Sequence, residues 1–288
     1  MTTQGTFHGT DGAELYYRII EPESRPKAAV ILIHGFGDHS GGLQNLSRSL
    51  VQNRYCVYAL DLRGHGKSSG KRGYISSWDE FRGDLQELQR LVALERPNLP
   101  LFIVGHSMGG VITLDYVLDH QTGITGAAVI SPAISYKATP FERFGITIMG
   151  KLKPDFSFTK KGNFHLHVKD PVLQAKLNPE GLRHNTVTPG LGRGLLQAID
   201  RVEEESGNIQ LPFLLQYGLD DKITPPEKLR EFFRHVGSAD KQAHEYPLTK
   251  HRPFDENGRE VVLEDLTCWL DQQVEKTQRV SIKFAGRT

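Results

Sequence analysis

Hydrophobic positions along the chain fall into two alternating kinds of segment. Short, nearly continuous apolar runs, each ending in a small or polar residue, occupy residues 28–35, 55–64, 101–107, 126–132 and 211–218. Such runs are typical of strands that are buried on both faces, and hence of a parallel sheet. Between them lie stretches whose apolar residues are three or four apart, as on one face of a helix. The alternation predicts an α/β fold with a doubly wound, mostly parallel sheet.

The helical pattern is clearest in a stretch that starts behind Ser77, which we expect to cap its N-terminus. The apolar positions of this helix are Trp78, Phe81, Leu85, Leu88 and Val92. Near the start of the chain, Asp11 and Gly12 separate two short runs of alternating polar and apolar residues. This is the turn chemistry of an antiparallel hairpin, so we expect two N-terminal strands outside the parallel part of the sheet.

Residues 133–209 interrupt the alternation. They are longer than a connection between two strands normally needs, and they mix Lys with Phe, Ile and Met. A chain of 288 residues is long enough for one sizeable core. We therefore predict a single domain over residues 1–288, with residues 133–209 inserted as a cap over the carboxyl edge of the sheet.

Composition argues against several classes of protein. With 35 basic and 34 acidic residues, the chain has no net charge that would attract nucleic acid. The sequence contains neither a zinc-like spacing of Cys and His nor a phosphate-loop motif. It has no basic start followed by an apolar run, and no segment approaches the roughly 20 apolar residues of a membrane span. We expect a cytoplasmic protein, with Cys56 and Cys268 as buried thiols.

The stretch "LFIVGHSMGG" (residues 101–110) carries the first candidate for chemistry. A serine on a tight turn between a strand and a helix projects its hydroxyl above the sheet, and the close approach of the two elements leaves space only for glycine. Gly105 and Gly109 stand at these flanking positions around Ser107. The free N–H groups at the start of the following helix would face any negative charge that develops near the serine.

A serine nucleophile needs a base and an acid. Along chains of this strand–serine–helix type, the acid follows the serine and the histidine follows the acid. Asp220 and Asp221 come after the strand "LPFLLQYG", and His251 lies in the next such loop, "LTKHRPFDE". Local chemistry does not separate the two aspartates. Asp61 is a rival acid at the end of an earlier strand, although it would require the acid to precede the serine.

Other histidines adjoin glycines at the ends of strands. We expect His34, His65 and His106 to orient loops by hydrogen bonding rather than to abstract protons. An oxyanion hole needs two backbone donors, and we nominate the N–H groups of Phe36 and Met108. The alternative for "HGFG" is a tight turn that needs glycine for its geometry alone.

The motifs "HGFGDHSGG", "DLRGHGKSSGKRGYI", "GHSMGG", "YGLDDKITPPE" and "HEYPLTKH" follow one another over most of the chain. In this order they resemble the α/β-hydrolase superfamily, and within it the monoacylglycerol lipase and lysophospholipase group. The resemblance implies Ser107 as nucleophile, with Asp221 and His251 completing a triad, since the family's Gly-x-x-Asp register begins at Gly218. It also implies Phe36 and Met108 as oxyanion donors.

The chain departs from the family pattern in two places. Leu62 replaces the first histidine of the usual "DHRGHG", and Pro253 stands in the loop after the catalytic histidine. The insertion, where these enzymes choose their substrate, matches least clearly. The resemblance is therefore weakest for the identity of the substrate.

The expected reaction is transfer of an acyl group to water through an acyl-enzyme on Ser107, without a metal or cofactor. Within the insertion, five apolar residues among lysines are candidate substrate-binding residues: Phe141, Phe144, Ile146, Ile148 and Met149. They would suit an acyl pocket for a single-chain lipid ester and transient contact with a membrane surface. They could equally pack on their own domain. Broad carboxylesterase, thioesterase or other hydrolase chemistry on a non-lipid substrate, and a non-catalytic binding protein, are the alternatives.

Overall fold

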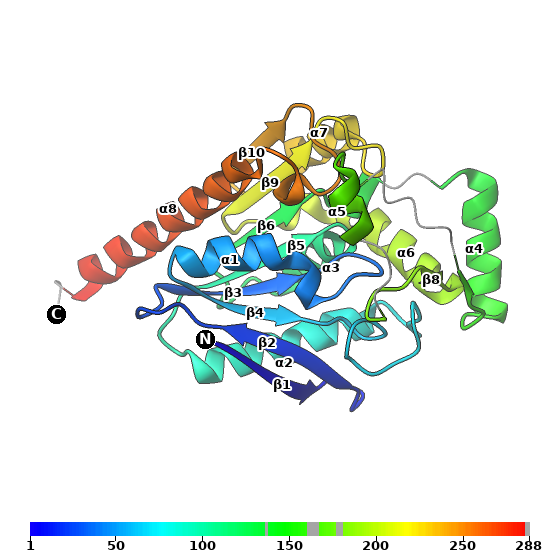
Figure 1. The fold of residues 1–288 in the computed structure, drawn as a ribbon, viewed down its shortest axis with the longest axis horizontal. Helices are drawn as coiled ribbons and strands as arrows, with labels where there is room; N and C mark the ends of the chain where they lie inside the picture. Colours follow the sequence, from blue (N-terminus) through cyan, green and yellow to red (C-terminus); the bar gives the residue numbers. More distant parts are fainter. Residues whose placement is uncertain (136–137, 160–166, 177–180, 286–288) are drawn as a thin grey trace.

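The computed structural model describes residues 1–135, 138–159, 167–176 and 181–285. Within them, eight strands form one sheet in the order β1-β2-β4-β3-β5-β6-β9-β10 (Figure 1). The strands are β1 (Thr2–His8), β2 (Glu14–Ile20), β3 (Ala28–Ile33), β4 (Tyr55–Leu60), β5 (Leu101–His106), β6 (Gly126–Ile130), β9 (Phe213–Gly218) and β10 (Lys241–Tyr246). The first two form an antiparallel hairpin, and β2 pairs antiparallel with β4. All other neighbours are parallel, which confirms the predicted fold.

Helices cover both faces of the sheet, and this explains the continuous apolar runs. The helices outside the β6–β9 connection are α1 (Gln44–Gln52), α2 (Asp79–Glu95), α3 (Met108–Asp119), α7 (Pro226–His235) and α8 (Arg259–Ala285). Ile31 and Ile33 of β3 belong to the core beneath α2 and α3, whereas Val30 and Leu32 belong to the core beneath α1 and α8. Both faces of each central strand must therefore be apolar.

The structure differs from the sequence prediction in two details, the start of one helix and the burial of one cysteine. Helix α2 begins at Asp79, with Trp78 rather than Ser77 at the N-cap position, although the Ser77 hydroxyl accepts the Asp79 N–H. Cys56 is buried as expected, but Cys268 is exposed, which makes that prediction wrong. It lies on α8 beside the buried Trp269, one residue away from the stripe that faces the sheet.

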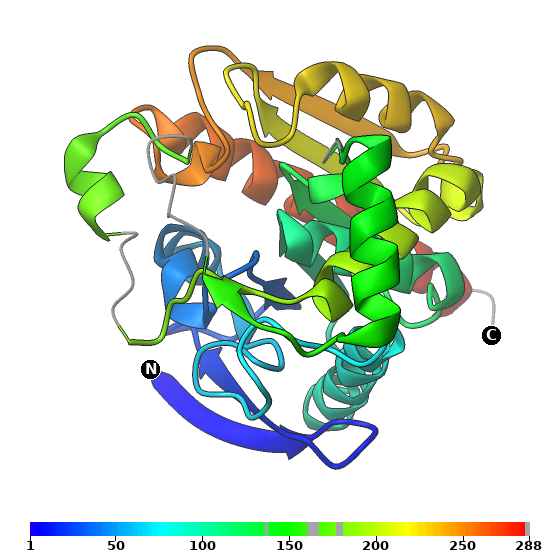
Figure 2. The same cartoon turned by 90° about the vertical axis from the view of Figure 1, so that its right-hand side faces the viewer.

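The connection between β6 and β9 spans residues 131–212 and contains the predicted insertion, residues 133–209. Its elements are α4 (Pro140–Leu152), β7 (Phe158–Thr159), α5 (Pro171–Lys176), β8 (Thr186–Val187) and α6 (Pro189–Glu205). Strands β7 and β8 pair antiparallel. Helix α6 packs against α3, and α4 packs against α6 on the side away from the sheet. Figure 2 views the molecule from this side, with α4 in front of the rest of the fold.

Among the residues that the structure describes, no helix is both long enough and apolar enough to cross a bilayer.

Candidate active site

Ser107 occupies the tight turn between β5 and α3. Its φ of 54° and ψ of −118° lie outside the regions that most side chains adopt, so the turn is strained. A Cβ at Gly105 would lie 2.3 Å from the Gly109 carbonyl oxygen. One at Gly109 would lie 2.5 Å from the carbonyl oxygens of Ile33 and His34. The steric requirement for both glycines, predicted from the sequence, is therefore confirmed.

The structure brings Ser107, His251 and Asp221 together in one hydrogen-bonded chain. His251 Nε2 lies 2.8 Å from Ser107 Oγ, and His251 Nδ1 lies 2.8 Å from Asp221 Oδ2. Asp221 follows β9, and His251 lies in residues 247–258, the histidine loop that follows β10. His251 and Asp221 are 1% and 3% exposed, whereas Ser107 is half-buried. The serine is thus the most accessible of the three.

The surroundings of Asp221 keep its carboxylate ionised. Burial alone would raise the pKa of Asp221, but the adjacent His251 and the donors of Thr224 lower it below the ordinary value of the carboxyl group. Asp221 Oδ1 accepts the backbone N–H groups of Ile223 and Thr224 at 2.8 and 2.9 Å. An ionised Asp221 that accepts from His251 Nδ1–H leaves Nε2 free to act as a base toward the serine.

The other two candidate acids point elsewhere. Asp220 is half exposed and forms an ion pair with Lys169 Nζ at 2.7 Å. Asp61 is buried at the end of β4, where it accepts the backbone N–H groups of Ser40 and Lys67 at 2.6 and 2.8 Å. Both carboxylates thus hold other partners, and Asp61 serves to close a loop.

Three further histidines hold loops in place, as expected. His106 Nε2 donates to the carbonyl oxygen of His251 at 3.0 Å, and the two rings lie 5.0 Å apart. His34 Nε2 accepts the N–H of Leu62 at 3.0 Å. His65 Nδ1 donates to a carbonyl oxygen of its own loop. Burial keeps the pKa of His106 well below 6.5, so its ring stays neutral. Through its hydrogen bond, this ring holds the backbone of His251, the candidate base.

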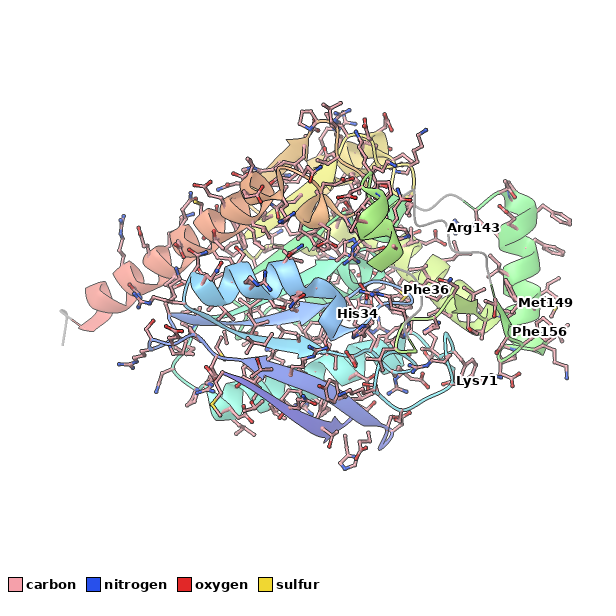
Figure 3. The ribbon with its side chains drawn as sticks, viewed as in Figure 1. His34, Phe36, Lys71, Arg143, Met149 and Phe156 are labelled. Carbon is pink, nitrogen blue, oxygen red and sulfur yellow. The ribbon has the colours of Figure 1, made fainter. Side chains whose placement is uncertain are left out.

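Phe36 and Met108 lie next to Ser107. Met108 is the first residue of α3, where an N–H group has no acceptor within the helix. Phe36 belongs to residues 34–43, the glycine loop that follows β3 (Figure 3). A Cβ at Gly35 would lie 2.9 Å from Ser107 Cβ, so this loop passes directly against the serine. The structure therefore places both residues nominated as oxyanion donors beside the candidate nucleophile.

Ser107 and His251 line a cavity of about 430 Å³, a volume within the usual range of small-molecule sites. Its walls are mostly apolar and come largely from the insertion. Side chains of this apolar wall include Ile146, Met149, Phe158, Val187, Leu191 and Leu195. The few polar side chains are those of Ser107, Thr188, Thr224, His167 and His251. Over the described residues, no group of three or more His, Cys, Asp or Glu side chains is arranged to hold a metal ion.

Of the five apolar residues expected to bind substrate, the structure brings two to the cavity. Ile146 and Met149 line it, whereas Phe141, Phe144 and Ile148 do not. Phe141 and Phe144 are 85% and 64% exposed. The reason is helical periodicity, because positions 141, 144 and 148 share one face of α4 and positions 145, 146 and 149 share another.

A buried ion cluster, which the sequence analysis did not identify, joins three segments of the site. Asp38 of the glycine loop is 5% exposed. Its Oδ2 accepts from Arg252 Nη1 and its Oδ1 from Arg183 Nε, each at 2.8 Å. Arg252 follows His251 in the histidine loop, whereas Arg183 belongs to the insertion. The cluster therefore ties both segments to the loop that carries Phe36.

Further contacts hold the glycine loop, the histidine loop and the insertion together. Arg252 Nε lies 2.7 Å from Asp255 Oδ2. Burial alone would raise the pKa of Asp38, but Arg252 and Arg183 hold it well below its usual range. The insertion also touches the glycine loop directly, since His184 N–H donates to the Gly37 carbonyl oxygen at 3.0 Å. The position of the insertion is thus coupled to the backbone beside Ser107.

Comparison with known proteins gives one family and a consistent set of relatives. The family model described as serine aminopeptidase, S33 matches residues 24–258. The chain is 28% identical over 271 residues to the monoacylglycerol lipase of Mycolicibacterium smegmatis, covering 93% of this chain and 96% of that protein.

Solved structures show the same fold. The crystal structure of Paleococcus ferrophilus monoacylglycerol lipase superposes with a TM-score of 0.79 at 28% identity, covering 89% of this chain and 99% of that one. A carboxyl esterase from Bacillus coagulans, solved in complex with glycerol, superposes with a TM-score of 0.85 at 18% identity, covering 95% and 99% of the two chains. At that lower identity, the likeness is one of fold.

The first prediction separates the two adjacent aspartates. We expect Asp221→Asn to lower kcat for a soluble ester by about 10⁴-fold, because the amide favours the wrong imidazole tautomer. Asp220→Asn breaks only an exposed ion pair and should leave kcat close to that of the unmodified protein. Initial rates with p-nitrophenyl butyrate measure both effects. Loss of activity in Asp220→Asn with activity retained in Asp221→Asn would reverse the assignment.

The second prediction concerns the buried ion cluster. Asp38→Ala removes the buried carboxylate that two largely buried guanidinium groups share, so we expect the free energy of unfolding to fall by about 3–5 kcal/mol. Asp155→Ala, which removes the exposed ion pair with Lys71, is the matched control and should cost less than about 1 kcal/mol. Urea unfolding of the three proteins gives the comparison, and equal losses in both variants would contradict it.

The stability that Asp38 contributes depends on pH, and the sign of this dependence follows from its lowered pKa. A carboxyl group with a depressed pKa in the folded state contributes stability above its unfolded pKa, about 3.9, and loses it as the pH falls through the folded value. The difference in stability between the unmodified protein and Asp38→Ala should therefore be full at pH 6 and shrink below about pH 4.

Proposed function

The chain belongs to the serine aminopeptidase, S33 family and is a serine hydrolase of the α/β-hydrolase fold; we propose that its substrates are carboxylic esters of single-chain lipids, monoacylglycerols or lysophospholipids. The observation that carries this proposal is the mostly apolar cavity that opens onto Ser107 beside His251. Long apolar side chains form its walls, as a site for an acyl chain requires. The relatives named monoacylglycerol lipase support the same choice.

In the proposed reaction, Ser107 Oγ attacks the ester carbonyl carbon while His251 Nε2 takes the hydroxyl proton. The N–H groups of Phe36 and Met108 stabilise the resulting oxyanion. His251 then gives its proton to the leaving alcohol, and a water molecule repeats the sequence on the acyl-enzyme. Asp221 holds the imidazole in place and stabilises its charged form. Each step uses only groups of this chain and water.

The insertion serves in this proposal as a cap over Ser107, with the two faces of α4 in different roles. Its inner face, with Ile146 and Met149, contacts the acyl chain. Its outer face and the segment after it carry exposed apolar side chains, namely Phe141, Phe144, Leu152 and Phe156, the last of which is labelled in Figure 3. Lys151 and Lys153 are exposed beside them. An apolar patch rimmed by lysines suits transient contact with an anionic lipid surface, so the protein would act peripherally at membranes.

The third prediction tests the lipid substrate. We expect kcat/KM for monoacylglycerols or lysophospholipids to rise with the length of the acyl chain until the cavity is filled, by up to about fourfold for each buried methylene. Ser107→Ala should abolish the activity. Hydrolysis of short soluble esters with no measurable cleavage of any long-chain lipid ester would instead make the protein a general carboxylesterase.

A pair of variants on α4 ties chain length to the cavity. Ile146→Trp fills part of the acyl wall and should shift the optimum to shorter chains. Thr147→Trp, on an exposed position of the same helix, is the matched control and should leave the optimum where it is. An unchanged optimum in Ile146→Trp would mean that the acyl chain does not lie against α4.

A further inference from the structure

Two consecutive residues of the insertion, Arg183 and His184, contact the turn that carries Phe36. This turn covers residues 35–38 and is closed by one backbone hydrogen bond of 3.3 Å, from its last residue to the carbonyl oxygen of its first. Its third residue, Gly37, has a φ of 71°, which glycine adopts without strain. A turn this short has little internal bonding, so its position depends on the contacts that surround it.

Each of the last three residues of the turn is held by one of these two residues. Arg183 Nε donates to Asp38 Oδ1 at 2.8 Å. The His184 N–H donates to the Gly37 carbonyl oxygen at 3.0 Å, and a Cβ on Gly37 would lie 2.2 Å from the His184 carbonyl oxygen. The imidazole of His184 meets the ring of Phe36 edge to face, with ring centroids 5.5 Å apart. Side chains and backbone of the turn therefore rest on the insertion.

Residues 183–188 are themselves anchored to the loop between β4 and α2. The rings of His184 and His65 lie 4.6 Å apart, and Thr188 Oγ1 donates to the Gly73 carbonyl oxygen at 2.7 Å. Burial lowers the pKa of His184 to about 4, so its ring is neutral at pH 7 and packs as an aromatic side chain. This segment of the insertion is therefore fixed between the glycine loop and the loop after β4.

The other end of the turn meets the candidate nucleophile, since a Cβ on Gly35 would lie 2.9 Å from Ser107 Cβ. The turn thus lies between Ser107 and the insertion. A donor stabilises an oxyanion only from about 2.7–3.1 Å, and removal of one donor costs on the order of 10²–10³ in kcat. A displacement of about 1 Å already costs up to about 10²-fold. Contacts that hold the backbone of Phe36 therefore bear on the rate of the chemical step.

We propose that Arg183 and His184 are positioning residues for the oxyanion hole: they hold the N–H of Phe36 where negative charge develops, so the insertion sets the rate of acyl transfer as well as the choice of substrate. This inference rests on the proposed function, in which Phe36 is an oxyanion donor. Neither Arg183 nor His184 lines the cavity of Ser107, so both act through the turn rather than on the substrate. Their effect must then be the same for every acyl group.

The test measures how kcat and KM change separately. An interaction made only in the transition state lowers kcat and kcat/KM equally when it is lost. We expect Arg183→Met to lower both by about 3- to 10-fold, less than the loss of a whole donor costs, and by the same factor for p-nitrophenyl acetate and p-nitrophenyl octanoate. His184→Ala should give the same pattern, and Arg183→Lys should recover part of the loss. Rates are taken per active site titrated with a fluorophosphonate, so that misfolded molecules do not count.

An alkyl trifluoromethyl ketone reports on the oxyanion hole without turnover. Ser107 Oγ adds to its carbonyl carbon, the electron pair of the C=O bond becomes an oxyanion, and the serine proton passes to His251. The adduct stays at this stage because no leaving group departs. Arg183→Met should raise the inhibition constant by the same factor by which it lowers kcat/KM.

Two controls show whether the effect passes through the turn. Arg143→Met breaks an ion pair with Asp200 that lies within the insertion, and it should change neither kcat nor the inhibition constant. Asp38→Asn weakens the pair with Arg183 from the other side. Adding Arg183→Met to Asp38→Asn should then lower kcat little further, because this cycle isolates the pair from the contacts that each residue makes elsewhere.

The outcomes separate the positioning role from the proposed function. An unchanged kcat and inhibition constant in Arg183→Met, an effect confined to KM or to long acyl groups, or additive effects of Asp38→Asn and Arg183→Met would each overturn the inference. If the unmodified protein cleaves no long-chain lipid ester while the effect of Arg183→Met on p-nitrophenyl acetate persists, the proposed lipid substrate fails and the positioning role stands.

Discussion

One short chain of hydrogen bonds, from Ser107 through His251 to Asp221, sets the requirement that the rest of the fold meets. Its three members come from loops after β5, β9 and β10, so these loops must approach within a few ångströms at one edge of the sheet. Glycine makes this possible, since a Cβ at Gly218 would lie 2.3 Å from the Thr249 carbonyl oxygen in the histidine loop. Parallel strands with helices on both faces supply the rigid support.

The insertion is attached to this support in two different ways. Near Arg183 and His167 it is bonded to the glycine loop and the histidine loop through buried or backbone contacts. At α4 it is held mainly through α6 and through exposed ion pairs such as Arg143 with Asp200. The part of the insertion beside His251 is therefore bonded to the loops that carry the candidate triad, whereas α4, which lines the cavity with Ile146 and Met149, is held more peripherally. Under the proposed function, this division would let chain-length preference change with little effect on the chemistry.

Sequence reasoning reached the sheet, its hairpin, Ser107 and His251 because local patterns and chain order encode them, whereas it left Asp220 and Asp221 open until the family resemblance favoured Asp221. Apolar runs mark strands with two buried faces, and Ser107 stands between glycines at a strand–helix turn. The cluster around Asp38 and the position of His167 escaped it, since each depends on contacts between segments far apart in the chain. The face of α4 that carries Phe141 was misjudged for a related reason: periodicity separates the two faces of a helix but does not say which one meets the cavity.

The central claim, that His251 activates Ser107 as a nucleophile, is tested most directly by mass spectrometry after reaction with a fluorophosphonate. The account predicts one covalent adduct, on Ser107, and a rate of labelling that falls by at least about 10³-fold in His251→Ala. An adduct on another residue, or labelling of Ser107 at the same rate without the imidazole, would contradict it.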